Sequence, residues 1–327
     1  MNKPNNSEQP VFIGGHRRSG TTLFMALLDG HAQLSVFPPD SGFFYGYFPV
    51  YEDSKYDNQQ RINRIIEFCY DNLRQQIAKV DPEKECDFPF EELQLRFREK
   101  AAQGNFTSKE LLVAMISAYR GTLGEGAGDT KRWVEKTTSS EIYAKHIFDW
   151  FPKAQFIHIL RDPRDNYASL KSGWEVRYKQ HHSEPRQLLQ SMIERGKLGM
   201  ELARENLKRY GRKRYLIVKF EELIGNPKAE LEKICNFLGI AYNHNLLKPT
   251  TLGRLWKGNN FKGQQFNGLS TANLGRWKER IIEHEAKVLE YYFRELMPYF
   301  GYQPHFDFNQ CIDAAVEHYK WHNYAKD

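Results

Sequence analysis

The stretch from Val11 to Leu28 constrains the fold more than any other part of the chain. The apolar run Val11-Phe12-Ile13 leads into a loop rich in glycine, arginine and hydroxyl side chains, and the apolar segment Leu23–Leu28 follows. A strand, a glycine-containing loop and a helix in this order are typical of the first unit of an α/β domain with a parallel sheet. We therefore expect the loop amides and the positive end of the helix to face a phosphate.

The alternation of strands and helices resumes after residue 131. Apolar runs predict strands at 132–137, 155–160 and 215–218, and helical spacing predicts helices at 140–151, 187–209, 229–238, 281–297 and 308–320. This order predicts a central, mostly parallel sheet with right-handed connections. A Gly- and Asn-rich loop is expected at 257–268.

Residues 41–130 have a different pattern. An aromatic-rich loop over 43–51 precedes apolar residues at helical spacing in 62–77 and 111–119. This pattern predicts a helical insertion packed over the sheet. The predicted organisation is a flexible tail at 1–10, one α/β domain at 11–305 that includes the insertion at 41–130, and a C-terminal helical extension at 306–327.

Composition narrows the class of protein. The 327 residues are 40% hydrophobic and 14% aromatic, which excludes extended disorder. The polar start and the lack of an apolar run of roughly 18 residues predict a cytoplasmic protein without a membrane span. The net charge of +6 fits an anionic ligand but is too small to predict nucleic-acid binding. The four cysteines have no metal-ligand spacing, so we expect reduced thiols and no metal.

The spacing of Gly15 and Gly20 matches the Walker A loop of nucleoside triphosphatases. Thr21, however, stands where that motif requires lysine, and Leu216-Ile217-Val218 leads into Lys219 rather than into an aspartate for Mg²⁺. Without the lysine, ATP chemistry loses a main electrostatic element. An ATP-dependent, kinase-like P-loop enzyme is therefore disfavoured and is kept as an alternative.

Arg18-Ser19-Gly20-Thr21-Thr22 resembles a different phosphate loop. It is similar to the 5′-phosphosulfate loop of the sulfotransferases that use 3′-phosphoadenylyl sulfate (PAPS), in the arginine form typical of tyrosylprotein and many bacterial sulfotransferases. The resemblance implies that PAPS binds at Arg17, Arg18, Ser19, Gly20, Thr21 and Thr22.

A second motif strengthens the resemblance. Arg161 follows an apolar strand and Ser169 comes eight residues later, as in the 3′-phosphate site of the same family. Arginine offers a planar pair of donors to a phosphate, and serine offers one hydroxyl. The alternative is that Arg161 pairs with Asp162 or Asp165 at the end of the strand.

Weaker matches extend the resemblance over most of residues 11–280. They are Glu135-Lys136-Thr137, the segment from Phe220 to Pro227, and Gly275-Arg276-Trp277-Lys278. The family places an aromatic ring, usually of tyrosine, near the adenine, so the resemblance implies that Phe220 stacks there without a hydrogen bond. Residues 41–130 have no match and should determine acceptor specificity.

The resemblance implies an α/β, P-loop-like enzyme that moves a sulfuryl group from PAPS to an acceptor hydroxyl on a small molecule, glycan, lipid or peptide. The product is adenosine 3′,5′-bisphosphate (PAP), and the chemistry needs no metal. Arg18 matches the family's catalytic basic residue and would stabilise the leaving group. Lys136 is a second candidate for the sulfonate or bridging oxygens, unless it pairs with Glu135. A non-catalytic PAP-binding protein is the other alternative.

The base for the acceptor hydroxyl is less well marked. Related sulfotransferases place a glutamate about twenty residues beyond the loop, and Asp40 lies at or next to that position. A turn or N-cap aspartate is the structural alternative. Thr138 stands where other members have a histidine after a Lys-Thr pair, so His16 is the reserve candidate. The aromatic run 43–51 either lines an acceptor pocket or packs in the core.

Overall fold

The computed structural model describes residues 9–38, 40–80, 87–125, 132–258 and 268–324. Five parallel strands form a central sheet in the order β2-β3-β1-β4-β5. They are β1 (Val11–Gly14), β2 (Leu34–Val36), β3 (Arg132–Lys136), β4 (Gln155–Leu160) and β5 (Tyr215–Lys219). The predicted parallel α/β sheet is confirmed. Of these five strands, β2 is absent from the sequence prediction, because three residues are too few to show a period. The two-residue strands β6 (Thr250–Thr251) and β7 (Arg254–Leu255), which form a separate antiparallel pair, were not predicted either.

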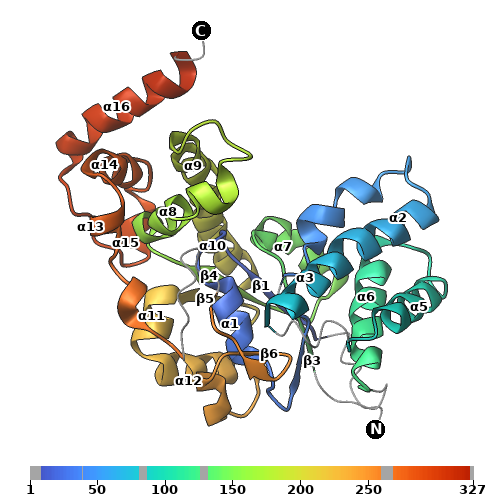
Figure 1. The fold of residues 1–327 in the computed structure, drawn as a ribbon. Helices are drawn as coiled ribbons and strands as arrows, with labels where there is room; N and C mark the ends of the chain where they lie inside the picture. The colour runs from blue at the N-terminus through green and yellow to red at the C-terminus, as the bar shows by residue number, and fades with distance from the viewer. Residues whose placement is uncertain (1–8, 39, 81–86, 126–131, 259–267, 325–327) are drawn as a thin grey trace.

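The side chains of β1 alternate between the two faces of the sheet. Val11 and Ile13 pack with helices α1 (Thr21–Leu28), α11 (Phe220–Gly225) and α12 (Pro227–Leu238), whereas Phe12 packs with α7 (Ala144–Trp150). A pleated strand imposes this alternation, and burial on both faces explains the nearly continuous apolar strand sequences. The sheet therefore lies between helices on both sides (Figure 1).

The predicted helical insertion packs on the Phe12 face of the sheet (Figure 1). It contains α2 (Asn58–Arg64), η4 (Ile65–Tyr70), α3 (Asp71–Val80), α5 (Phe90–Ala101) and α6 (Ser108–Thr122). The segment 43–51, predicted as a loop, instead forms two short helical turns, η2 (Phe43–Tyr47) and η3 (Val50–Glu52). Most of its rings are buried, so the backbone that carries them must pair internally: the Phe48 N–H donates to the Phe43 carbonyl at 2.8 Å.

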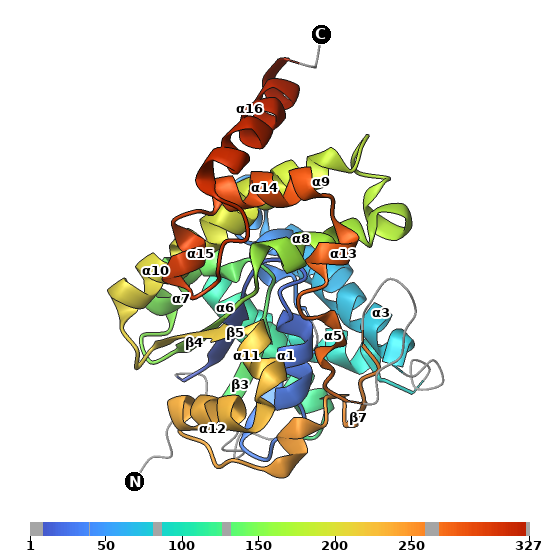
Figure 2. The same cartoon turned by 90° about the vertical axis from the view of Figure 1, so that its left-hand side faces the viewer.

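Another group of helices, from the segments that follow β4 and β5 in sequence, packs around its own core. Before β5 come α8 (Pro163–Lys171), η6 (Trp174–Tyr178), α9 (Arg186–Ser191), η7 (Met192–Gly196) and α10 (Lys197–Tyr210). After β5 come α13 (Trp277–Arg280), α14 (Glu283–Tyr292), α15 (Leu296–Tyr299) and α16 (Phe308–Tyr324). The helices predicted at 187–209 and 281–297 are each divided into shorter segments. Helix α16 projects away from the body of the molecule (Figure 2).

Parts of four sequence predictions fall outside the described residues. They are the first eight residues of the tail predicted at 1–10, residues 81–86 and 126–130 of the insertion predicted at 41–130, residues 259–267 of the loop predicted at 257–268, and residues 325–327 of the extension predicted at 306–327. Across the described ranges, no helix combines the length and apolar character needed to cross a bilayer.

Candidate active site

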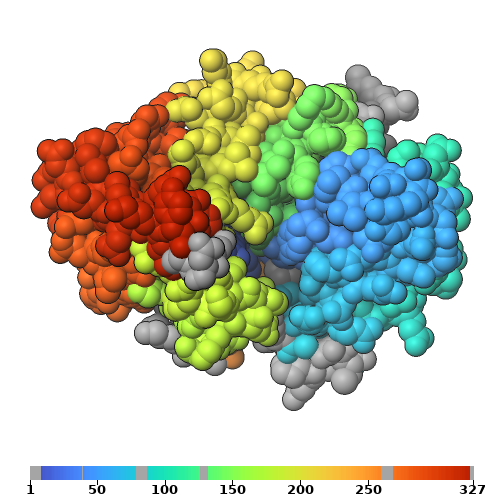
Figure 3. All heavy atoms as spheres, turned by 90° about the horizontal axis from the view of Figure 1, so that it is seen from above, coloured from blue at the N-terminus to red at the C-terminus, as the bar shows by residue number. Residues whose placement is uncertain are grey.

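The C-terminal ends of the five strands bring the predicted site residues together. The loop Gly15–Gly20 follows β1, Asp40 follows β2, Lys136 ends β3, Arg161 follows β4 and Phe220 follows β5. Parallel strands end at one edge, where ligands bind in open α/β sheets. Seen from above, the molecule has a hollow between the yellow-green segment after β4 and the blue part of the insertion, with the dark blue start of the chain at its base (Figure 3).

The phosphate loop has a backbone conformation that requires glycine. Gly15 and Gly20 have φ angles of +136° and +106°, and Arg18 is left-handed at +69°. A Cβ on Gly20 would lie 2.4 Å from the ring of Phe220, far inside contact distance. The Ser19 N–H donates to the His16 carbonyl at 3.0 Å and closes the turn. The loop therefore ends at the start of α1, where an anion is favoured.

The two predicted phosphate motifs are in direct contact. Arg18 Nε donates to Ser169 Oγ at 3.1 Å, and Arg161 Nη1 donates to the Arg18 carbonyl at 3.2 Å. Arg161 Nη2 donates to the Asn273 carbonyl at 2.8 Å. The Arg161 guanidinium also lies 4.5 Å from the centre of the Phe220 ring, in a cation–π contact. Residues far apart in sequence thus meet at one point.

The neighbouring aspartates have other partners than Arg161. Asp162 forms an ion pair with Arg164 at 2.6 Å. Asp165 accepts two backbone N–H bonds from the segment 275–277, at 2.7 and 2.8 Å. Among the described residues Arg161 makes no ion pair within 4 Å with Asp162 or Asp165, so the alternative holds only as a longer-range attraction between their charges, and Asp165 anchors the late glycine–tryptophan segment.

His16 and Arg17 connect the loop to the helices beside it. His16 Nδ1 lies 2.7 Å from Asn166 Oδ1, and Asn166 Nδ2 donates to the Arg17 carbonyl at 3.1 Å. Arg17 Nη2 donates to Ser191 Oγ at 2.8 Å. Burial lowers the pKa of His16 from 6.5 to about 4, so His16 is neutral and a weak base at pH 7.

Asp40 and Lys136 form an ion pair. Lys136 Nζ lies 2.6 Å from Asp40 Oδ2, and Thr138 Oγ1 donates to the same oxygen at 2.7 Å. The Asp40 side chain is 24% exposed and that of Lys136 only 3%, so Asp40 is the more accessible member of the pair. The alternative pairing of Lys136 with Glu135 is wrong, because the Glu135 carboxylate accepts from Ser41 Oγ and the Lys136 ammonium contacts Asp40.

The aromatic run 43–51 divides between core and surface. The core interpretation holds for Phe43, Phe44, Tyr47 and Phe48, which are all buried. Tyr45 is half exposed and interacts with Asp40. Burial, with a smaller effect of the Asp40 charge, raises the pKa of Tyr45 above its ordinary value. Tyr45 is thus the aromatic residue of this run that borders the candidate base.

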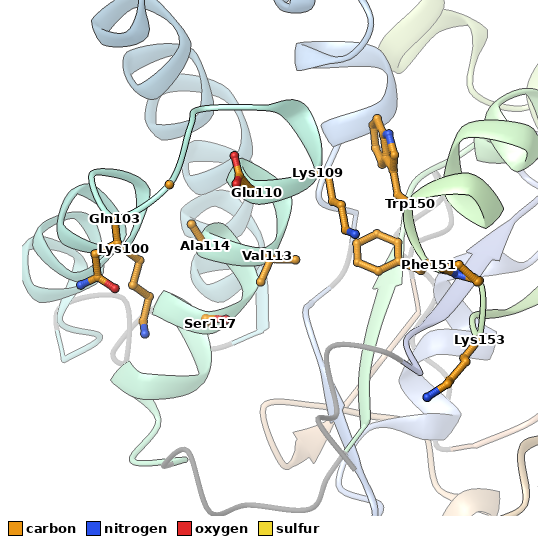
Figure 4. A pocket seen from close by; sticks show the side chains of 12 residues that line it. Lys100, Gln103, Lys109, Glu110, Val113, Ala114, Ser117, Trp150, Phe151 and Lys153 are labelled. Carbon is orange, nitrogen blue, oxygen red and sulfur yellow. The ribbon is translucent and has the colours of Figure 1, made fainter.

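A separate hollow of about 800 Å³ lies between α5, α6 and the end of α7 (Figure 4). Lys100, Lys109 and Phe151 are among its lining residues, and Lys109 Nζ lies 5.5 Å from the centre of the Phe151 ring. None of the predicted site residues lines this hollow. It is therefore distinct from the site at the strand ends.

A comparison with known protein families identifies the chain. The profile of the Sulfotransferase family matches residues 10–244. The chain belongs to the sulfotransferase family. The matched segment contains both phosphate motifs of this sulfotransferase, from the loop after β1 to Ser169 in α8, and all five strands of the central sheet.

Curated relatives of this sulfotransferase act on different acceptors. The 3-beta-hydroxysteroid sulfotransferase of Cavia porcellus is 26% identical over 225 residues, which cover 56% of this chain and 75% of the relative. The protein-tyrosine sulfotransferase A of Caenorhabditis elegans is 26% identical over 248 residues, which cover 72% of this chain and 51% of the relative. The chain thus spans about half the length of the tyrosine-specific relative.

Solved structures show the same fold. The sulfotransferase domain of the Synechococcus PCC 7002 olefin synthase superposes with a TM-score of 0.55 at 20% identity, covering 90% of this chain and 96% of that one. The sulfotransferase domain from the curacin biosynthetic pathway superposes with a TM-score of 0.55 at 17% identity, covering 90% of this chain and 98% of that one. The architecture of the sheet and helices is therefore that of a sulfotransferase.

Sulfotransferases of this family use PAPS, and the loop residues fit its phosphates. Several buried polar atoms around the loop have no hydrogen-bond partner within the described part of the chain; besides His16 Nε2 they include Ser19 Oγ, Arg17 Nε and Arg161 Nε. A buried polar atom without a partner costs about 1–3 kcal/mol, which an anionic ligand would recover. Burial lowers the pKa of Arg18 to about 10, so Arg18 stays charged at pH 7. These atoms suit a ligand with several anionic oxygens.

The sequence analysis did not single out Glu141. Glu141, inside the segment 140–151 predicted as a helix, is buried below the phosphate loop, and no local pattern distinguishes it from a surface glutamate.

Among the described residues, no group of three or more His, Cys, Asp or Glu side chains is placed to hold a metal. A metal-free reaction stays a prediction.

Proposed function

We propose that this sulfotransferase moves a sulfuryl group from PAPS to a hydroxyl on an acceptor and releases PAP. PAPS supplies an activated sulfuryl group on a phosphate leaving group. The observation that best supports this proposal is the direct contact of the two motifs through Arg18, Ser169 and Arg161. A nucleotide with both a 5′ and a 3′ phosphate needs donors at two neighbouring points. ATP lacks the 3′ phosphate, so a kinase would have no use for the second motif.

The phosphate residues divide into two groups in this proposal. Arg17, Ser19, Gly20, Thr21 and Thr22 would hold the 5′ end, and Arg161 with Ser169 would hold the 3′ phosphate. Phe220 would lie at the adenine end, beside Arg161. Arg18 would stabilise the departing phosphate oxygen, because negative charge develops there in the transition state.

Asp40 is the proposed base. Its Oδ2 is engaged by Lys136 and Thr138, which leaves Oδ1, a weaker acceptor of the Gly42 N–H at 3.2 Å, to take the proton of the acceptor hydroxyl. Lys136 would hold Asp40 in place and put positive charge beside the transferred group. The buried His16, with a pKa of about 4, is less suited to the task.

The acceptor is proposed to carry its hydroxyl on a ring. The names of two relatives, a hydroxysteroid and a protein-tyrosine sulfotransferase, describe hydroxyls of this kind. The half-exposed ring of Tyr45 beside Asp40 offers such an acceptor a packing surface. The cytoplasmic location, the metal-free reaction and the division of the chain at residue 305 stay predictions.

Sulfuryl transfer from radiolabelled PAPS to a panel of steroids, tyrosine peptides, glycans and lipids tests the proposal. We expect label on at least one ring hydroxyl, and none with the Arg18→Ala variant. Binding of PAP without transfer to any acceptor would favour the non-catalytic alternative. Consumption of ATP under the same conditions would favour the kinase.

A further inference from the structure

A buried polar cluster that the proposed mechanism does not use lies below the phosphate loop. Glu141, in η5 (Ser140–Tyr143), is 1% exposed, and its Oε2 accepts a hydrogen bond from the Gly15 N–H at 2.7 Å. His158 on β4 is fully buried, and its Nε2 lies 4.0 Å from Glu141 Oε1. The other ring nitrogen of His158 lies 2.7 Å from the Tyr215 hydroxyl, and Asn206 Nδ2 donates to the Glu141 carbonyl at 3.1 Å.

The surrounding backbone leaves just enough room for the Glu141 carboxyl. A Cβ on Gly14 would lie 2.8 Å from Glu141 Oε2, and a Cβ on Gly199 would lie 3.2 Å from Oε1. Gly14 ends β1 and Gly199 lies on α10. Two glycines on separate elements therefore make space for one carboxyl, which is held against the first residue of the loop.

The segment 139–141 holds both peptide groups of Gly15. The Gly15 N–H donates to the Glu141 side chain, and the Gly15 carbonyl accepts from the Ser139 N–H at 3.0 Å. The φ angle of Gly15 is +136°, so a rotation of this residue would redirect every amide that follows it in the loop. The direction of the loop amides thus depends on the segment 139–141.

We propose that Glu141 is a positioning residue for the phosphate loop: it fixes the Gly15 peptide so that the amides after it face the nucleotide, and its ionisation weakens nucleotide binding. The inference rests on the proposed function, because it takes PAP as the ligand of the loop. Glu141 would act through Gly15 and would not touch the nucleotide.

The charge state of Glu141 is the variable part of this cluster. Burial raises the pKa of Glu141 from 4.5 to about 7, against the hydrogen bond from Gly15 and the attraction of the exposed Arg195. The other titratable groups that face it are His158, whose pKa burial lowers to about 3, and Tyr215, whose pKa burial raises well above 10. Both stay neutral between pH 6 and 8. An ionised Glu141 repels the anionic nucleotide, so PAP affinity should fall as pH rises through 7.

Titration calorimetry with PAP at pH 6 and pH 8, at one salt concentration, tests the charge dependence. Glu141→Gln keeps an oxygen acceptor for Gly15, so it should bind PAP like the wild type at pH 6. At pH 8 the wild type should bind up to about tenfold more weakly than Glu141→Gln, since about one pH unit separates the measurement from the pKa. Titration of PAP itself is common to both proteins and cancels in the comparison.

Glu135→Gln is the matched control for nucleotide affinity. Glu135 is also fully buried and its pKa is also raised to about 7, but it accepts from Ser41 and Thr137 instead of from the loop. Its variant should keep the pH dependence of the wild type. The proposal would be overturned if PAP affinity changed with pH equally in the wild type and in Glu141→Gln, or if Glu135→Gln lost the pH dependence of PAP affinity.

Hydrogen exchange without nucleotide tests the positioning role separately. Glu141→Ala leaves the Gly15 N–H without its acceptor, so the amides of the peptide covering residues 11–24 should exchange several-fold faster than in the wild type or in Glu141→Gln. Unchanged exchange in Glu141→Ala would overturn the role. If the wild type binds no PAP, the proposed function fails, whereas this measurement still decides the role of Glu141.

Discussion

The two walls of the candidate site are built by different forces. On the phosphate wall, polar side chains bind one another across long sequence separations, as Arg18 does with Ser169 and Arg17 with Ser191. Behind the other wall, which is proposed to hold the acceptor and is called the acceptor wall below, buried rings such as Phe43 and Phe44 pack edge to face, 5.3 Å apart. Phosphate binding dictates residue type and spacing, whereas a packed core requires only volume and apolarity. Substitutions on the two walls should therefore change different kinetic quantities.

The largest effect on turnover is expected from substitution of Asp40, the polar residue that borders the acceptor wall. Asp40→Asn removes the proposed base and should lower kcat by about 10²–10⁴-fold with PAP affinity unchanged, while the loss of the ion pair with the buried Lys136 should lower the thermal stability. Steady-state kinetics measures kcat, titration calorimetry measures PAP affinity, and thermal unfolding measures stability. Asp149→Asn, which alters an exposed aspartate paired with Lys145, is the matched control. Wild-type turnover in Asp40→Asn would exclude Asp40 as the base, and His16→Ala would be the next variant.

Arg18→Ala should produce the next largest effect. The loss of one preorganised donor to the developing charge typically costs about 2.7–4 kcal/mol, or about 10²–10³-fold in kcat. PAP affinity should fall less, because the interaction strengthens only in the transition state. Arg18→Lys, which keeps the charge, should retain part of the turnover. Equal losses of turnover and PAP affinity would reduce Arg18 to a phosphate anchor.

Arg161→Ala should separate PAP from ADP. Loss of a charge-assisted bond to the 3′ phosphate should lower PAP affinity by about 10–150-fold, which corresponds to about 1.5–3 kcal/mol. ADP lacks that phosphate and should lose only the small part that reflects the bond from Arg161 to the Arg18 carbonyl. Ser169→Ala should show the same selectivity with a smaller loss. Calorimetry with both nucleotides isolates the difference, and equal losses for PAP and ADP would make the second motif structural.

The smallest effect is expected from Tyr45→Phe. This change keeps the exposed ring and removes the hydroxyl beside Asp40, so kcat/KM for the acceptor should fall by about 2- to 10-fold. PAP affinity should stay at the wild-type value. Tyr51→Phe, in the same aromatic run but stacked on Tyr47, should change neither quantity. A loss of PAP affinity in Tyr45→Phe would show that the two walls are not independent.

The phosphate wall was predictable from sequence for a physical reason. An anion at a strand end needs glycine, hydroxyl and arginine in a short local pattern, so Arg18 to Thr22 predict a phosphate site without any tertiary information. The parallel sheet was predictable because its buried strands are continuous apolar runs. Helix α5 was missed although Phe90, Leu93 and Phe97 have helical spacing, because charged residues separate them.

Other features depend on contacts that no local pattern encodes. The ion pair of Asp40 with Lys136 joins residues from two neighbouring strand ends, and the local sequence offered Glu135 as the alternative partner of Lys136. Glu141 gained its place only because Gly14 and Gly199 leave space for it. The role of the aromatic run was also open in the sequence, since a ring in a core and a ring at a surface have the same local signature.

The contact of Arg161 with Asn273 bears on how the protein is made. Asn273 and the backbone donors at 275–277 hold the second motif from beyond residue 244, where the family match ends. A chain growing on the ribosome therefore contains both phosphate motifs long before the residues that clamp them emerge. Donor binding should appear late in synthesis, after most of the 327 residues have been translated, and not when the second motif leaves the exit tunnel.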